Sequence, residues 1–158
     1  FGQEFENMCW GLRRIAEDNK DVCIVYPVHL NPNVQRPVYD ILGKIERIIL
    51  TKPLEYIPFV WLLRRCHFVI TDSGGIQEEA PALGKPALVM RRVTERPEGV
   101  QAGVARLVGT DSDSIYLAAQ QLLENPDSYK EMAHAINPYG DGQASRRISN
   151  ILFSHLGR

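Results

Sequence analysis

Residues 71–86 read TDSGGIQEEAPALGKP and place a hydroxyl and two glycines directly after an apolar run. A glycine leaves room for a ligand to approach the backbone closely and tolerates dihedral angles that other residues avoid. A helix beginning near Ile76 would present free N–H groups and a partial positive charge at its start. Because Ser73 can add a hydroxyl donor there, Ser73, Gly74 and Gly75 predict a phosphate-binding loop.

Two adjacent carboxylates follow this loop. We expect Glu78 and Glu79 in the first turn or so of the helix, where a carboxylate can accept hydrogen bonds from ribose hydroxyls. A simpler interpretation stays open, because a serine cap and early glutamates also favour an ordinary helix start. Short glycine motifs have many false positives, so this motif alone does not choose between the two.

A second loop carries cations. MRRVTERPEG, residues 90–99, follows the next expected strand and contains Arg91, Arg92 and Arg96. Arginine suits bidentate phosphate binding. Since loops after neighbouring parallel strands face the same cleft, the two loops together predict a nucleoside diphosphate site.

Alternating strand and helix patterns must position these loops. The helices are expected at residues 5–16, 33–43, 54–66, 76–83, 111–125, 127–135 and 144–156. The strands are expected at residues 21–28, 47–51, 67–71, 86–90 and 106–109, with 91–99 as a loop. Continuous apolar strands such as IIL and FVI indicate a parallel sheet covered by helices on both faces. We therefore expect one Rossmann-like α/β domain over residues 1–158.

Composition narrows the class of protein further. The 158 residues are 44% hydrophobic and 23% charged with a net charge of -1, which favours a soluble domain without nucleic acid or a membrane as main partner. Cys9, Cys23 and Cys66 are odd in number and lack a CxxC pair, which favours buried thiols over a disulfide framework. The four histidines show no metal-ligand spacing.

Longer motifs resemble a known family. TDSGGIQEEAPALGKP, MRRVTERPEGVQAG, LVGTD and NPYGDGQASRRI occur in the order typical of the non-hydrolysing UDP-N-acetylglucosamine 2-epimerases. The resemblance covers essentially the whole chain and implies the carboxyl-terminal half of a two-domain enzyme of the glycosyltransferase-B type. It implies inversion of C2 to give UDP-N-acetylmannosamine, through elimination and re-addition of UDP. No metal and no cofactor is implied for this route.

The resemblance also implies particular binding residues. Ser73, Gly74 and Gly75 match the family's diphosphate loop, Glu79 its ribose-binding glutamate, and Arg96 an arginine close to the nucleotide.

Three further positions carry alternatives. Phe59 matches a position beside the uracil, where backbone groups read the base edge, although ordinary core packing also explains a phenylalanine there. His29 matches a histidine of a second, regulatory site for UDP-N-acetylglucosamine, and the alternative is a strand-end histidine bonded to nearby backbone. Arg92 departs from the acidic residue common in the family, which adds a cation near the cleft.

The resemblance places most catalytic residues of the family outside residues 1–158. Its acids and bases belong mostly to the other domain, and its active-site histidine lies in a motif that ends where Phe1 begins. We therefore expect a fragment that lacks its amino-terminal domain, contains no catalytic residue, binds UDP weakly or not at all, and catalyses nothing alone. The resemblance further implies a cytoplasmic homodimer that serves cell-envelope polysaccharide or sialic-acid synthesis, two routes that stay open.

Two other functions use the same features. A glycosyltransferase of the same architecture would also have a diphosphate loop and a ribose glutamate in this half. A non-catalytic module that senses a UDP-sugar would need the same pocket without the reaction.

Overall fold

The computed structural model describes residues 2–156, and Phe1, on which the expectation of a fragment partly rests, lies outside them. The helices are α1 (Gln3–Asp18), α2 (Pro32–Leu42), α3 (Tyr56–Arg65), α4 (Gly74–Ala82), α5 (Pro97–Gln101), α6 (Ser112–Glu124), α7 (Pro126–Ala133) and α8 (Ala144–Leu156). The strands are β1 (Ile24–Pro27), β2 (Ile48–Thr51), β3 (Val69–Thr71), β4 (Ala87–Val89) and β5 (Ala105–Leu107).

Every strand pair is parallel, as the apolar strand pattern predicts. The hydrogen-bonded ladders form two groups, β1–β2 and β3–β4–β5. Ile24 of β1 and Ile70 of β3 pack against the same two clusters of buried residues. Side-chain packing thus joins the two groups into one α/β core.

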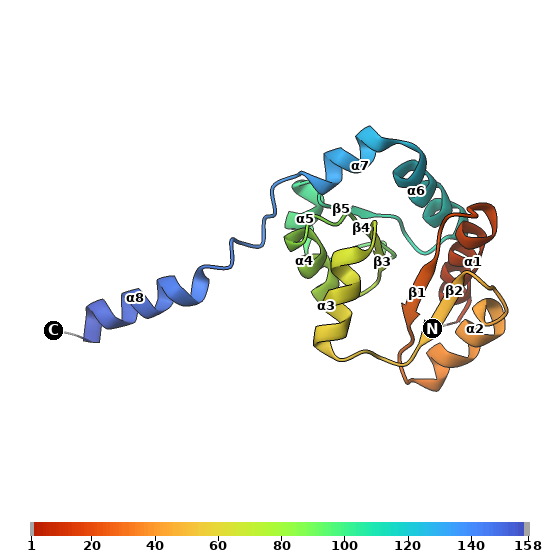
Figure 1. The fold of residues 1–158 in the computed structure, drawn as a ribbon, viewed down its shortest axis with the longest axis horizontal. Helices are drawn as coiled ribbons and strands as arrows, with labels where there is room; N and C mark the ends of the chain where they lie inside the picture. Colours follow the sequence, from red (N-terminus) through yellow and green to blue (C-terminus); the bar gives the residue numbers. More distant parts are fainter. Residues whose placement is uncertain (1, 157–158) are drawn as a thin grey trace.

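Helices cover both faces of the three-stranded group. Alternate residues of β4 point to opposite faces, so their contacts show which helices lie on each face. Ala87 and Val89 pack with residues of α3 and α4. Leu88, between them, packs with α1, α6 and α7. Figure 1 shows α3, α4 and α5 gathered on one side of these strands, with α1 and α6 on the other. The expected α/β class with helices on both faces is confirmed.

The start of α4 differs from the expected one and matters for the site. This helix begins at Gly74 instead of near Ile76, so both glycines belong to its first turn. It ends in a Schellman motif, where Lys85 N–H bonds to Ala80 O and Gly84 N–H to Pro81 O. Gly84 takes φ +67°, the left-handed conformation that this motif requires.

The arginine loop also differs from the expected one. Residues 91–99 are not loop throughout, since α5 begins at Pro97 with Arg96 as its N-cap residue. Proline is favoured at the first helical position because its ring fixes φ and the missing N–H would have no partner there. The sequence pattern missed α5 because the helix is only five residues long.

The last helix stands apart from the other elements. Figure 1 shows α8 projecting from the body at the end of an extended segment. None of its described residues is buried. Its apolar side chains are therefore exposed: Ile148, Ile151, Leu152, Phe153 and Leu156.

Candidate nucleotide site

The amino-terminal end of α4 has the form of an anion-binding site. Ser73 is its N-cap residue, with φ −84° and ψ 133°, and its N–H donates to Thr71 Oγ1 at 3.0 Å. The Ser73 side chain makes no capping hydrogen bond, so its hydroxyl is not used to satisfy the helix. Ser73 is thus the N-cap residue of the simpler interpretation, but without the side-chain hydrogen bond of a typical serine cap. The first N–H groups of a helix have no partner within the helix, so a site of this form can bind an anion.

The two glycines serve close approach and not unusual dihedral angles. Neither Gly74 nor Gly75 has a positive φ, which corrects the expectation that they supply special backbone conformations. A Cβ atom on Gly74 would lie 3.0 Å from Glu95 Oε1, so an oxygen already rests against this backbone. A Cβ on Gly75 would meet Glu79 Oε1 at an ordinary 3.9 Å. The backbone of both glycines therefore lies near a carboxylate oxygen.

The neighbouring glutamates have different surroundings. Both lie in the second turn of α4 and not in its first, because the helix begins two residues earlier than expected. Glu78 forms an ion pair with Arg96 Nε. Glu79, the expected ribose ligand, lies with its carboxylate towards Gly75 at the start of the helix.

The three arginines of the loop point to different partners. Arg91 Nη1 pairs with Glu95 Oε2 at 2.7 Å. Arg96 lies beside Gly74, since its Nη2 is 4.0 Å from the place that a Cβ atom on Gly74 would take. Arg92 instead pairs with Glu4 of α1 at 2.7 Å, with 76% of its side chain exposed. The departure at Arg92 thus adds a cation whose charge Glu4 balances.

Charge pairing dominates this end of the sheet. The pKa of Arg96 is raised by its hydrogen bond to Glu78 and by the Glu78 charge. The pKa of Glu95 is lowered, first by a hydrogen bond to its own backbone and then by the Arg91 guanidinium. Both arginines near α4 therefore pair with carboxylates.

A buried amide links the two loops, and the motif analysis missed it. Gln77 is 0% exposed. Its Oε1 accepts from Thr94 Oγ1 at 2.6 Å, and its Nε2 donates to Ser73 O at 3.3 Å. Thr94 Oγ1 in turn accepts the Arg96 N–H at 3.0 Å. A glutamine inside an otherwise apolar helix stripe was the available signal, since buried polar groups are kept where they have partners.

Phe59 and His29 make local contacts in this structure. The Phe59 side chain packs against the buried cluster around Val89, which bears out its core-packing alternative, and its N–H donates to Glu55 O at 3.0 Å. His29 is exposed, and its Nδ1 accepts the Asn31 N–H at 3.1 Å, as the strand-end alternative describes. Contact of Phe59 with a base and the regulatory role of His29 stay predictions.

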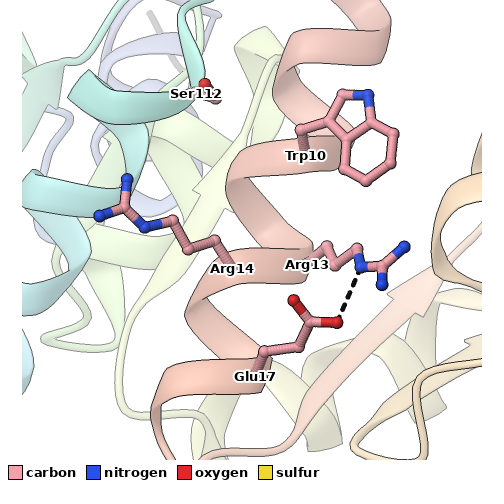
Figure 2. A pocket seen from close by; sticks show the side chains of 5 residues that line it. All are labelled: Trp10, Arg13, Arg14, Glu17 and Ser112. Carbon is pink, nitrogen blue, oxygen red and sulfur yellow. Dashed lines mark hydrogen bonds and ion pairs between the residues drawn. The ribbon is translucent and has the colours of Figure 1, made fainter.

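A separate hollow of about 320 Å³ lies where α1 meets α6 (Figure 2). Trp10, Arg13, Arg14 and Glu17 of α1 line it together with Ser112 of α6. Arg13 pairs with Glu17, and Arg14 reaches Asp113 at 2.7 Å. Because both guanidinium groups hold carboxylates and the elements differ from those around Gly74, we interpret the hollow as part of the helix contact.

The cysteines among residues 2–156 differ in burial. Burial raises the pKa of Cys9 to about 12, so its thiol is inert, whereas Cys23 is exposed and does not fit the expected set of buried thiols. Across these residues no three or more His, Cys, Asp or Glu side chains gather as a metal site would require. No helix among them has both the length and the apolar character needed to cross a bilayer.

Comparison with known proteins places these features in a family. The family model described as UDP-N-acetylglucosamine 2-epimerase matches residues 1–153. UDP-N-acetylglucosamine 2-epimerase of Salmonella typhimurium is 55% identical over 155 residues, which are 98% of this chain and 41% of that protein. The chain thus spans about two fifths of the length of this relative.

Solved structures agree with the sequence comparison. UDP-GlcNAc 2-epimerase from Neisseria meningitidis bound to UDP-GlcNAc superimposes with a TM-score of 0.92 at 44% identity, over 97% of this chain and 41% of that one. The S. aureus MnaA–UDP co-structure gives a TM-score of 0.94 at 44% identity, over 99% and 43%. The chain belongs to the UDP-N-acetylglucosamine 2-epimerase family.

Proposed function

We propose that this chain is the UDP-binding half of an enzyme that converts UDP-N-acetylglucosamine to UDP-N-acetylmannosamine. The observation that carries the proposal is the start of α4, where the Ser73 hydroxyl makes no capping hydrogen bond and the backbone of Gly74 lies beside Arg96, with the Glu95 carboxylate against it. Backbone N–H groups and an arginine suit a diphosphate that leaves as UDP and then returns as a nucleophile.

Uridine binding would extend from this anion site. The Glu79 carboxylate lies near Gly75, and we propose that it accepts hydrogen bonds from the ribose hydroxyls. Phe59 is proposed to lie beside the uracil, and His29 to contribute to a second UDP-N-acetylglucosamine site. Arg96 would exchange its Glu78 partner for the diphosphate.

The reaction itself would require residues beyond this chain. The Salmonella typhimurium relative is longer, since the matched residues are 41% of it. We propose that an amino-terminal domain supplies the groups that move the C2 proton, and that α8 packs on that domain through its exposed apolar side chains. We further propose a cytoplasmic homodimer that serves polysaccharide synthesis. Family membership makes the glycosyltransferase alternative the weaker one.

Calorimetry with UDP, UDP-N-acetylglucosamine and ADP tests the proposal. We expect weak but measurable heat for both uridine nucleotides, and weaker or no binding of ADP, because the base and ribose contacts add to a shared diphosphate site. Equal affinity for ADP and UDP would contradict the proposed uridine site.

Turnover tests the division of labour between the two halves. The purified 158-residue chain should form no UDP-N-acetylmannosamine from UDP-N-acetylglucosamine, because no group of the chain is assigned to C2. Product formation by this chain alone would refute that part of the proposal.

A further inference from the structure

The NPYGDG stretch, residues 137–142, contacts the arginine loop through Tyr139. The Tyr139 hydroxyl donates to Arg96 O at 3.5 Å. The stretch is held in shape by its own hydrogen bonds, since Asn137 Oδ1 accepts the Tyr139 N–H at 3.1 Å and Asn137 Nδ2 donates to Gly140 O at 3.3 Å. Residues 137–142 therefore contact Arg96, the arginine that is proposed to bind the diphosphate.

Tyr139 also packs closely against Gly99, where only glycine leaves room for its ring and hydroxyl. Gly99 is buried in α5, and a Cβ atom there would lie 3.2 Å from Tyr139 Cζ and closer still to the hydroxyl oxygen. Burial raises the pKa of Tyr139, while a hydrogen bond with the Gly99 backbone acts against that rise. The hydroxyl therefore stays protonated at neutral pH and can donate to Arg96 O.

Arg96 is the N-cap residue of α5, so its backbone determines where its guanidinium points. Thr94 Oγ1 holds the Arg96 N–H from one side, and Tyr139 holds the Arg96 carbonyl from the other. We propose that Tyr139 is a positioning residue that fixes the Arg96 backbone, so that the guanidinium is presented to the diphosphate at the start of α4. The proposal rests on the proposed function only for the identity of the ligand.

Two substitutions disturb the same contact from opposite sides. Tyr139→Phe removes the hydroxyl and keeps the ring, whereas Gly99→Ala keeps the hydroxyl and displaces it. Tyr129→Phe is the matched control, because the Tyr129 hydroxyl also donates to a backbone carbonyl, that of His67, at 3.1 Å. Tyr129 lies on α7, outside the arginine loop.

Two measurements separate this proposal from the proposed function. The first is the ¹⁵N resonance of the Arg96 Nε–H in the 158-residue chain without ligand, which needs no nucleotide. The second is the affinity for UDP, with KM and kcat of the full-length protein as the companion. We expect Tyr139→Phe and Gly99→Ala each to shift the Arg96 resonance and to weaken UDP binding by roughly threefold to tenfold, the range of one hydrogen bond. KM should rise more than kcat falls.

The double variant gives the sharpest result. Because both substitutions break one contact, Tyr139→Phe combined with Gly99→Ala should weaken binding no more than the larger single change. An unchanged Arg96 resonance in Tyr139→Phe, additive losses, or an equal loss in Tyr129→Phe would overturn the positioning role. If the unsubstituted chain fails to bind UDP while the resonance still shifts, the proposed function fails and the positioning role stands.

Discussion

Glu78 and Glu79 are adjacent in sequence but face different tasks in this structure. Glu78 neutralises Arg96, and Glu79 lies with its carboxylate near Gly75. Adjacent helical residues point about 100° apart, so only one of them can face a ligand at the start of the helix directly. Because Glu78 pairs with Arg96, Glu79 is the one that we propose for contact with ribose.

Glu79→Gln should weaken UDP binding roughly threefold to tenfold, because the amide oxygen still accepts from a hydroxyl but without the charge of the carboxylate. It should leave the affinity for 2′,3′-dideoxy-UDP nearly unchanged, since that ligand lacks the hydroxyls. Calorimetry with both ligands measures the difference. Glu78→Gln is the control, and it should affect the two ligands alike. Equal losses for both ligands in Glu79→Gln would remove the ribose role.

Gln77 joins the phosphate loop to the arginine loop through Ser73 O and Thr94 Oγ1. Gln77→Leu should lower the free energy of unfolding by about 1–3 kcal/mol, because it leaves the Thr94 hydroxyl without its buried acceptor. Urea denaturation measures the loss. Thr94→Val should cost a similar amount, and the double variant should cost less than the sum. Thr51→Val, which removes a hydroxyl bonded to Lys52 O, serves as control. Fully additive losses would show that the link does not act as a unit.

The sequence could identify the residue types at the site but not their partners. Ser73, Gly74 and Gly75 were predicted from hydroxyl and glycine patterns, whereas the choice of Glu79 and Arg96 among the glutamates and arginines came from the family resemblance. The structure brings all five to the start of α4. The pairing of Arg96 with Glu78 could not be read in advance, because either glutamate can reach an arginine of the next loop.

Caps define the helices α6 and α7 that cover one face of the sheet. Asp111 accepts the N–H groups of Asp113 and Ser114, and Asn125 accepts those of Asp127 and Ser128. The pKa of Asp111 is lowered from its ordinary 3.8, first by its hydrogen bonds with Ser114. Asparagine caps about as well as aspartate but does not titrate.

The acid sensitivity of α6 follows from the direction of this pKa shift. Because the folded pKa is lowered, the Asp111 contribution is present above pH 3.8 and is lost as the pH falls through the folded-state value. The difference in unfolding free energy between Asp111→Asn and the unsubstituted chain should therefore become smaller as the pH falls below 3.8. Urea midpoints across the acid range measure this. Asn125→Asp should introduce the opposite dependence at α7, and a parallel pH profile in both variants would contradict the assignment.

Long elements were easier to predict than short ones. The helical spacing in α1 and α6 extends over several turns, and both helices are found where the pattern places them. The strands have three or four residues each, and α5 has five, so their ends depend on tertiary contacts more than on pattern. Whether neighbouring strands form a ladder, as β3–β4–β5 do, depends on backbone alignment that side-chain types do not encode.

The exposed apolar stripe of α8 is the strongest sign that this chain has a further contact to make. Ile151 and Leu152 are 57% and 53% exposed. Replacing both with serine should change the unfolding free energy of the 158-residue chain by no more than about 0.5 kcal/mol, as for other surface positions. In the full-length protein the same change should lower the urea midpoint, because the proposed domain contact is lost.

A buried leucine provides the comparison for this α8 double variant. Leu122→Ala, at a position 1% exposed, should cost about 2–5 kcal/mol in the chain alone. If the serine variant destabilises the 158-residue chain to the same extent, then α8 packs on this domain and is not available to another.

The central claim is that UDP binds by its diphosphate at the start of α4. Titration of the ¹⁵N-labelled chain with UDP, followed through its amide resonances, tests this most directly and detects weak binding. We predict the largest shifts at Ser73, Gly74, Gly75 and Arg96, and their loss in Gly75→Ala, whose Cβ fits the ligand-free fold with its nearest neighbour at 3.9 Å. Shifts centred instead on the hollow between α1 and α6, or unchanged by Gly75→Ala, would contradict the account.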